Sequence, residues 1–324
     1  MNGFDLSTAS DIVYNGSTVT AVYCGSTLIW PPQQHDYSQD YFTIRSLANN
    51  NTITFSDWLQ STSSHYTIYV SNDDGLTWSS YTSSFYNTTI ATLDAGEKIL
   101  IKGNNSHYGT TNTTMTKDFS FFQSTDNCEV EGNIMSLVYG DNFIGQTTLI
   151  DDYTFTELFD LLLVNAENLV LPATTIAPHC YYALFRNRTR LLKAPKILPA
   201  TTLALQCYGN MFYGCTVLTT APTLPATTLA QGCYVSMFSW CESLTTAPTL
   251  PATTLLNQSY DSMFYNCYAL NSVTCLATDI SASNCTQLWL QGVSSTGTFT
   301  KNSAMSSWPT GVSGIPLHWT VQDY

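Results

Sequence analysis

The chain has 324 residues, which leaves room for two or three domains and a sizeable core. Its formal net charge is −13 although only 10% of its residues are charged, so Thr, Ser, Asn and Tyr must cover most of the surface. Because Lys and Arg total only 10, we expect no nucleic-acid partner, since such binding depends on neutralising phosphates. No segment approaches the roughly 20 consecutive apolar residues that span a bilayer, so we expect no membrane insertion.

The N-terminal 32 residues contain a short duplication. Residues 13–19 read VYNGSTV, and residues 22–28 repeat this as VYCGSTL. Apolar residues that alternate around a central Gly-Ser predict two tight β-hairpins. So small a module scarcely folds alone, and we expect it to pair with another copy or to pack on a larger body. The N-terminus also lacks the basic and apolar regions of a secretion signal, although a chain without its original signal would read the same.

The motif Val-Tyr-x-Gly-Ser-Thr-x-x-Trp-Pro in this segment resembles the N-terminal attachment segment of virion proteins in crAss-like and related gut phages. The resemblance implies that residues 1–32 attach the chain to other virion proteins. It places Tyr14, Tyr23 and Trp30 at that contact.

Residues 41–117 predict a β-sandwich. Strand-like alternation recurs at residues 41–44, 52–55, 66–70, 88–93 and 98–102, with turn residues at short intervals between these runs. For about 80 residues of this pattern we expect an immunoglobulin-like (Ig-like) β-sandwich.

Between two of these predicted strands lies Ser71-Asn-Asp-Asp-Gly-Leu-Thr-Trp78. It is similar to the Asp-box of sialidase propellers, where the motif is a structural hairpin corner. A sialidase needs several copies and an arginine cluster, whereas this chain has one copy and only Arg45 before Arg186. We therefore expect Asp73 and Asp74 to serve the turn, and binding of calcium there is the alternative.

The second half of the chain is a repeat. Its opening Leu falls at positions 171, 198, 224, 250 and, in an eroded copy, 276, which gives steps of 27, 26, 26 and 26 residues. This is a solenoid period. Nine residues after the opening Leu come Cys180, Cys207, Cys233, Ser259 and Cys285, and fourteen after it come Phe185, Phe212, Phe238, Phe264 and Leu290. A single coil cannot bury its own apolar face, so these positions should stack into one continuous core.

The recurring pattern Phe-x-x-Cys-x-x-Leu followed by Leu-Pro resembles the BspA-like branch of the leucine-rich repeats, over about residues 145–293. The resemblance implies a curved, right-handed solenoid used in adhesion or recognition, and no catalysis. We expect residues 118–293 to form this solenoid with capping strands at its N-terminal side, and residues 294–324 to form a C-terminal cap. Residues 207–212 predict one short helical turn in each coil. The expected fold class is thus mostly β with short helical turns.

The chain has ten cysteines, which raises the question of metal or disulfides. Their positions in the repeat are also occupied by Ser259, Val293 and Arg188, which a ligand set or an obligatory bridge would tolerate poorly. Closely spaced Cys and His pairs, which zinc sites usually need, do not accompany them. We therefore expect buried, reduced thiols, no metal and no cofactor.

No catalytic constellation can be read from the sequence, and we expect no enzyme. The five histidines are scattered over different modules. A pair of glycosidase carboxylates brought together by folding stays open. Five of the ten basic residues cluster in the first repeat, at Arg186, Arg188, Arg190, Lys193 and Lys196. They predict a solvated face, a contact with the acidic N-terminal half, or a docking patch.

Residues that differ between otherwise similar coils should face solvent. Fifteen residues after the opening Leu these are Arg186, Tyr213, Ser239 and Tyr265, and Trp240 and Tyr268 follow at the sixteenth and eighteenth positions. We expect Arg186 and the four aromatic residues to bind a partner. Exposed aromatic side chains along a solenoid suit the binding of a protein or a glycan. The alternative is packing between coils or subunits.

Taken with the two resemblances, these features predict a non-catalytic phage virion fibre or fibre-associated protein that binds host surface or neighbouring virion proteins. We expect it in the virion, assembled in the host cytoplasm, as a homo-oligomer and by preference a homotrimer. A bacterial BspA-like surface adhesin is the alternative, and a capsule-degrading glycan hydrolase is a third.

Overall fold

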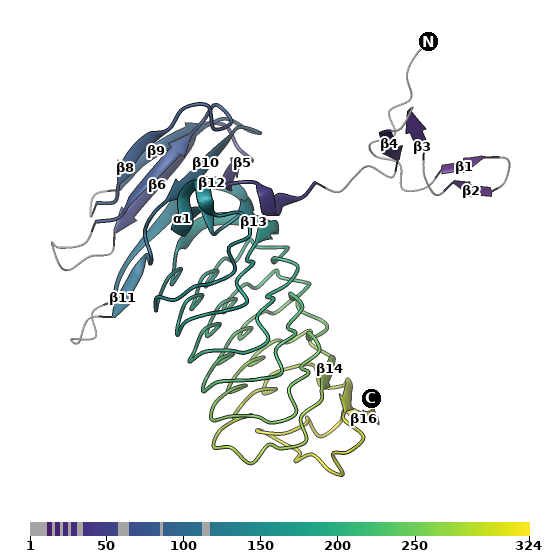
Figure 1. Cartoon of the computed structure of the whole chain (residues 1–324). Coiled ribbons are helices and arrows are strands. Elements are labelled where there is room, and N and C mark those ends of the chain that lie inside the picture. The colour runs from purple at the N-terminus through teal and green to yellow at the C-terminus, as the bar shows by residue number, and fades with distance from the viewer. Residues whose placement is uncertain are drawn as a thin grey trace. The chain divides into compact units, whose positions relative to one another are not determined.

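This computed structural model describes residues 35–57, 65–84, 87–111 and 117–324, together with the backbone of four short strands between residues 12 and 30. The described chain is mostly β (Figure 1). Its helical residues are confined to η1 (Tyr37–Gln39), α1 (Ser136–Tyr139) and η2 (Gly140–Asn142). The chain divides into two compact units, Met1–Asp36 and Tyr37–Tyr324.

The first unit contains two antiparallel strand pairs. Strand β1 (Ile12–Tyr14) pairs with β2 (Ser17–Val19), and β3 (Val22–Cys24) pairs with β4 (Thr27–Trp30). These are the two hairpins that the duplication predicts.

The second unit begins with a single curled sheet of nine strands. Its main path runs β8-β7-β10-β5-β12-β6-β9, with β11 and β13 also paired to β12. The strands are β5 (Phe42–Ser46), β6 (Asn51–Asp57), β7 (Thr67–Ser71), β8 (Ser79–Thr82), β9 (Thr88–Leu93), β10 (Lys98–Gly103), β11 (Gly109–Thr111), β12 (Lys117–Asn133) and β13 (Phe159–Val170).

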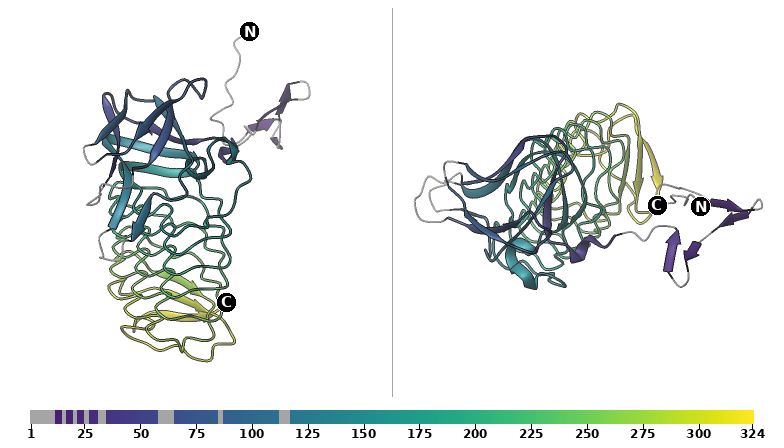
Figure 2. Two further views of the ribbon diagram at one scale, coloured as in Figure 1. Left: turned by 60° about the vertical axis from the view of Figure 1, so that its left-hand side comes forward. Right: turned by 90° about the horizontal axis from the view of Figure 1, so that it is seen from above.

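The two ends of this path approach each other. Ser84, just after β8, forms a bridge with Ser56 of β6, and the Thr88 hydroxyl of β9 donates to the carbonyl oxygen of Thr82 at 3.1 Å. The sheet is therefore a near-closed barrel, visible in both views of Figure 2, rather than the two facing sheets of the predicted Ig-like β-sandwich.

Strand β12 is the physical reason for the difference. It is 17 residues long. Its residues 120–124 pair with β6, and its residues 128–131 pair with β5. One long strand thus joins by hydrogen bonds two groups of strands that a sandwich would keep as separate sheets. The predicted boundary between residues 117 and 118 falls inside this strand.

Strand β12 also leads into the repeats, because it pairs in parallel with β13. Residues 145–170 form a leading coil, on which five further coils are stacked (Figure 1). We number these by their opening Leu: coil 1 (171–197), coil 2 (198–223), coil 3 (224–249), coil 4 (250–275) and coil 5 (276–301).

Backbone hydrogen bonds join each coil to the next. The Tyr208 N–H donates to the Cys233 carbonyl one coil further on at 3.1 Å, whereas the N–H of the preceding Cys207 donates back to Ala204 at 3.3 Å. The same alternation recurs along this side of the coils. The predicted helical turn at residues 207–212 is therefore wrong: among the described coil residues the segment is a series of turns.

Left-handed residues explain these turns. In coil 2 they are Gln206, Asn210 and Gly214, with φ of 46°, 55° and 72°. A left-handed residue at every fourth position interrupts a right-handed helix before it completes a second turn. It also turns alternate N–H groups toward the neighbouring coil.

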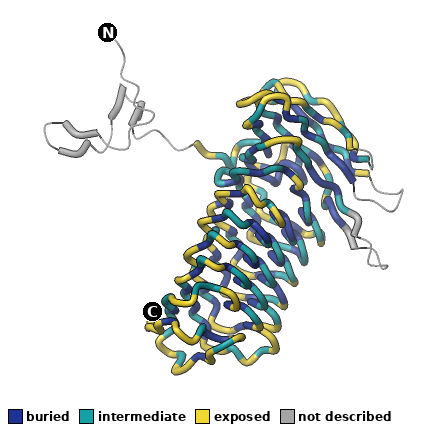
Figure 3. Tube along the Cα trace, turned by 180° about the vertical axis from the view of Figure 1, so that it is seen from behind, coloured by how far each residue is buried: buried dark blue, intermediate teal, exposed yellow. Residues whose placement is uncertain are grey.

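Aromatic ladders fill the interior of the stack. The rings of Phe185, Phe212, Phe238 and Phe264 follow one another at 5.2, 5.4 and 5.6 Å and lie within 4° of parallel. All four are fully buried, and each contributes about 1.5–3 kcal/mol by burial alone. Figure 3 shows that buried segments recur from coil to coil along the stack. The predicted shared core of the repeats is thus present.

Three parallel strands join the last coils to the C-terminal segment: β14 (Ser272–Cys275) ends coil 4, β15 (Thr298–Lys301) ends coil 5, and β16 (Thr320–Asp323) lies beyond the coils. Trp308 stacks on Trp289 of coil 5 at 5.5 Å, and Phe299 packs against both rings. These aromatic side chains close the apolar end of the stack.

Candidate functional site

The thiols lie inside the coils. The nine described cysteines are buried and free of disulfides, which confirms their predicted burial. In three coils the sulfur donates to a carbonyl of the preceding coil, from Cys215 to Phe185, from Cys241 to Phe212 and from Cys267 to Phe238, at 3.0–3.1 Å. Burial raises the pKa of Cys215 and Cys267 to about 12. Among the residues that the structure describes, no group of three or more His, Cys, Asp or Glu side chains could hold a metal ion.

One group of polar residues in the barrel has the composition of a catalytic triad. The buried carboxylate of Asp57 accepts a hydrogen bond from the Ser120 hydroxyl and contacts His65 Nδ1 at 2.9 Å. The carboxylate thus lies between the hydroxyl and the imidazole. A histidine that activates a serine must itself contact the hydroxyl, so this order does not support nucleophilic catalysis.

The Asp-box forms the turn between β7 and β8. Asp73 accepts hydrogen bonds from the Ser71 hydroxyl at 2.6 Å and the Thr77 N–H at 2.9 Å, and these bonds lower its pKa to about 2. Trp78 donates its indole N–H to Gly75, and Asp74 pairs with Lys98 at 3.0 Å. Both carboxylates have protein partners, in agreement with a structural role for the motif.

Three of the five clustered cations form ion pairs with the leading coil. The pairs are Arg186 with Glu157 at 3.9 Å, Arg188 with Asp160 at 2.7 Å and Lys193 with Glu167 at 2.8 Å. These pairs join neighbouring coils. Glu157 and Asp160 belong to the N-terminal half, with which the sequence predicts a contact, and Glu167 lies just beyond it. Arg190 differs, because its Nη1 donates to the neutral Asn127 Oδ1 at 2.6 Å and it has no described carboxylate within 4.0 Å.

The five residues predicted to bind a partner come together in two groups, which we call the strip. The Arg186 guanidinium lies 5.6 Å from the centre of the Tyr213 ring. The Trp240 ring lies 6.3 Å from that of Tyr265 and 6.1 Å from that of Tyr268, at angles of 69° and 87°. All five side chains are exposed or half-buried, and Tyr268 is 50% exposed. The strip therefore crosses coils 1 to 4 at the surface. The expectation of exposure is wrong for Ser239, which is buried and donates its hydroxyl to the Ser262 carbonyl oxygen.

Trp240 has an unfavourable backbone conformation. Its φ is 63°, in the left-handed region that a bulky side chain rarely adopts. The same position in the other coils is Asn187, Gly214, Asn266 and Gly292, the residue types that this conformation favours. A tryptophan here costs about 1–2 kcal/mol of strain.

The sequence analysis did not predict this strain. Asn or Gly at the same position in the other four coils already indicated a left-handed backbone there. The backbone alone would select Asn or Gly at position 240. The half-buried indole packs against the Tyr265 and Tyr268 rings of coil 4, as in the alternative of packing between coils, and leaves part of its surface to solvent.

The predicted attachment residues Tyr14, Tyr23 and Trp30 lie outside the residues whose side chains the structure describes. None of the described helices is long or apolar enough to cross a membrane. Comparison with protein-family models, curated proteins and solved structures finds no match to this chain.

Proposed function

We propose that the chain is a non-catalytic phage virion fibre or fibre-associated protein whose strip binds host surface or a neighbouring virion protein. Stacking of coils with a 26-residue period supports a BspA-like leucine-rich-repeat solenoid as the scaffold. The observation that carries the proposal is Trp240, a half-buried surface aromatic residue kept at a left-handed position.

A solenoid suits this task because its surface is extended while its core is shared. Each of coils 1 to 4 contributes one or two side chains to the strip at a spacing set by backbone hydrogen bonding. Tyr and Trp provide large contact area at a low cost in side-chain entropy. In this proposal the N-terminal hairpins attach the chain to the virion through Tyr14, Tyr23 and Trp30. The barrel lies between the hairpins and the coils in chain order, and the fibre is a homotrimer.

Immunogold electron microscopy of intact phage particles, labelled against this chain, tests the assignment. Label at the particle surface is expected. Label confined to the envelope of uninfected bacteria would instead support the alternative, a BspA-like adhesin, for which the same strip would serve.

The non-catalytic part of the proposal has its own test. Purified chain incubated with capsular polysaccharide should release no reducing ends. Release at a rate that depends on chain concentration would favour the glycan hydrolase.

A further inference from the structure

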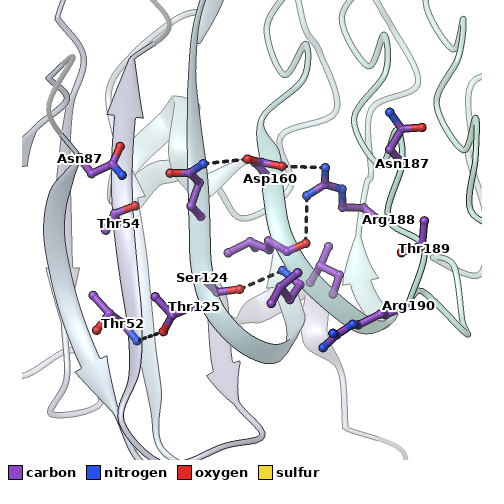
Figure 4. A pocket seen from close by; sticks show the side chains of 14 residues that line it. Thr52, Thr54, Asn87, Ser124, Thr125, Asp160, Asn187, Arg188, Thr189 and Arg190 are labelled. Carbon is purple, nitrogen blue, oxygen red and sulfur yellow. Dashed lines mark hydrogen bonds and ion pairs between the residues drawn. The ribbon is translucent and has the colours of Figure 1, made fainter.

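A groove lies where the barrel meets the coils (Figure 4). Its volume is about 400 Å³, within the range of about 300–1,000 Å³ for small-molecule sites. Thr52, Ser124 and Thr125 come from the barrel side, and Arg188 and Arg190 come from coil 1. It is separate from the strip, because none of the five strip residues lines it.

A break in strand pairing shapes the groove. Gln123 of β12 pairs with Asp160 of β13, and the next paired residues are Asn127 and Leu162. Three residues of β12, at 124–126, therefore lie opposite one residue of β13, at 161. Bulges of this kind redirect side chains. Here Ser124 Oγ accepts the N–H of Leu162 at 2.9 Å, and Ser124 and Thr125 line the groove.

The opposite charges on one wall of the groove, Asp160 and Arg188, neutralise each other. Asp160 accepts hydrogen bonds from Gln123 Nε2 at 2.8 Å and pairs with Arg188 Nη2 at 2.7 Å. Arg188 also donates to the carbonyl oxygen of Leu161 at 3.1 Å. Arg188 and Asp160 therefore hold the leading coil to coil 1, and they offer no net charge to a ligand.

Most N–H donors of the Arg190 guanidinium have no described partner. A guanidinium carries five N–H groups, and the structure gives it one partner, the neutral side chain of Asn127. The net charge of the chain is −13, yet the exposed Arg190 has no described carboxylate within 4.0 Å, because Asp160 in the same groove pairs with Arg188. Arg190 is therefore available to an anion. The planar guanidinium suits bidentate recognition of a carboxylate.

The remaining lining residues suit a hydroxyl-bearing ligand. Thr54, Asn87, Asn187 and Thr189 supply hydroxyl and amide groups, and the half-buried Leu162 supplies a small apolar surface. Sugars present hydroxyls at their edges and C–H groups on their faces. We propose that this groove binds an acidic sugar, with its carboxylate on Arg190 and its hydroxyls on the surrounding Thr and Asn side chains. The site goes beyond the proposed function, in which the strip binds the host surface or a neighbouring virion protein.

Isothermal titration calorimetry of the full chain with sodium glucuronate, glucose or sodium sulfate tests this inference. Glucuronate should bind saturably and more tightly than either glucose or sulfate. The substitution Arg190→Gln should weaken glucuronate binding about tenfold or more, as expected for loss of a charge-assisted bond. The matched control is Lys196→Gln, because Lys196 also lacks a described carboxylate within 4.0 Å but does not line the groove. It should bind like the wild type.

A second variant keeps the charge unchanged. Thr189→Val removes a hydroxyl for which the structure shows no hydrogen-bond partner, so it should leave the melting temperature unchanged and still weaken glucuronate binding. The inference is overturned if glucuronate does not bind saturably, if Arg190→Gln binds it as well as wild type, or if sulfate competes equally. Trp240→Gly should leave glucuronate binding intact, so failure of the strip and failure of the groove give different results.

Discussion

The Cys241 thiol donates a hydrogen bond to the carbonyl oxygen of Phe212 in the preceding coil, at a distance of 3.1 Å. The thiol thus fills a small apolar space and also gives this buried backbone oxygen a second donor, because the oxygen already accepts the N–H of Cys215 at 3.1 Å. This double role explains why cysteine recurs at this position in coils 2, 3 and 4.

Burial of these thiols predicts low reactivity. Because desolvation raises the pKa of Cys215 and Cys267 to about 12, almost none of either thiol is ionised near neutral pH. Ellman's reagent should therefore label the nine described cysteines only slowly in the native protein and rapidly in guanidinium. Labelling at the same rate in both conditions would contradict the sealed core.

The phenylalanine ladder should dominate stability in the repeats. Phe238 is fully buried between Phe212 and Phe264, so Phe238→Ala should lower the free energy of unfolding by about 3–5 kcal/mol, as core aromatic truncations do. The control is Leu76→Ala, since Leu76 is 85% exposed and should change stability by less than about 0.5 kcal/mol. Urea unfolding measures both, and equal effects would argue against the ladder.

The strain at Trp240 predicts that glycine is more stable than alanine at this position, which is the reverse of the usual order. Because φ is 63° at this position, Trp240→Gly should be more stable than Trp240→Ala by about 1 kcal/mol. At Tyr213, where φ is not positive, the matched pair Tyr213→Gly and Tyr213→Ala should show the opposite order. Chemical denaturation of the four variants measures both differences. The same order at both positions would show that no strain is stored at Trp240.

The Asp-box predicts a pH dependence with a definite sign. Hydrogen bonds from Ser71 and Thr77 lower the pKa of Asp73 from 3.8 to about 2 in the folded chain. Its contribution to stability is therefore fully present above pH 3.8, and it is lost as the pH falls through 2.

Comparison of wild type with Asp73→Asn isolates this contribution, because all other carboxylates are common to both. The advantage of wild type in urea should shrink as the pH is lowered from 5 to 2. An advantage that stays constant over this range would mean that the carboxylate charge does not support the turn.

The repeat was predictable because its physics is local. A fixed spacing of Phe and Cys requires only that identical coils stack. The barrel was not predictable in this way, because it depends on β12 pairing with both β5 and β6. Such pairing is non-local, and alternation of apolar residues reports only which face of a strand is buried. The left-handed turns around Asn210 were not predicted either, because the spacing of residues does not report the sign of φ.

Of the two candidate sites, the strip could be predicted from the sequence and the groove could not. Variation between copies found the members of the strip, because exposed positions of a repeat are free to differ. A bulge in β12 shapes the groove beside Arg190. Arg190 is available to a ligand there because it has no described carboxylate partner within 4.0 Å. Neither feature has a counterpart in the spacing of residues along the chain.

Recognition through the strip is tested most directly by adsorption of the phage particles that carry this chain to their host cells, in the presence of excess purified chain. The proposal predicts that wild-type chain inhibits adsorption and that Trp240→Gly inhibits at least about tenfold less well, as expected for loss of an aromatic hot spot. Equal inhibition by the two proteins, or none by either, would contradict it.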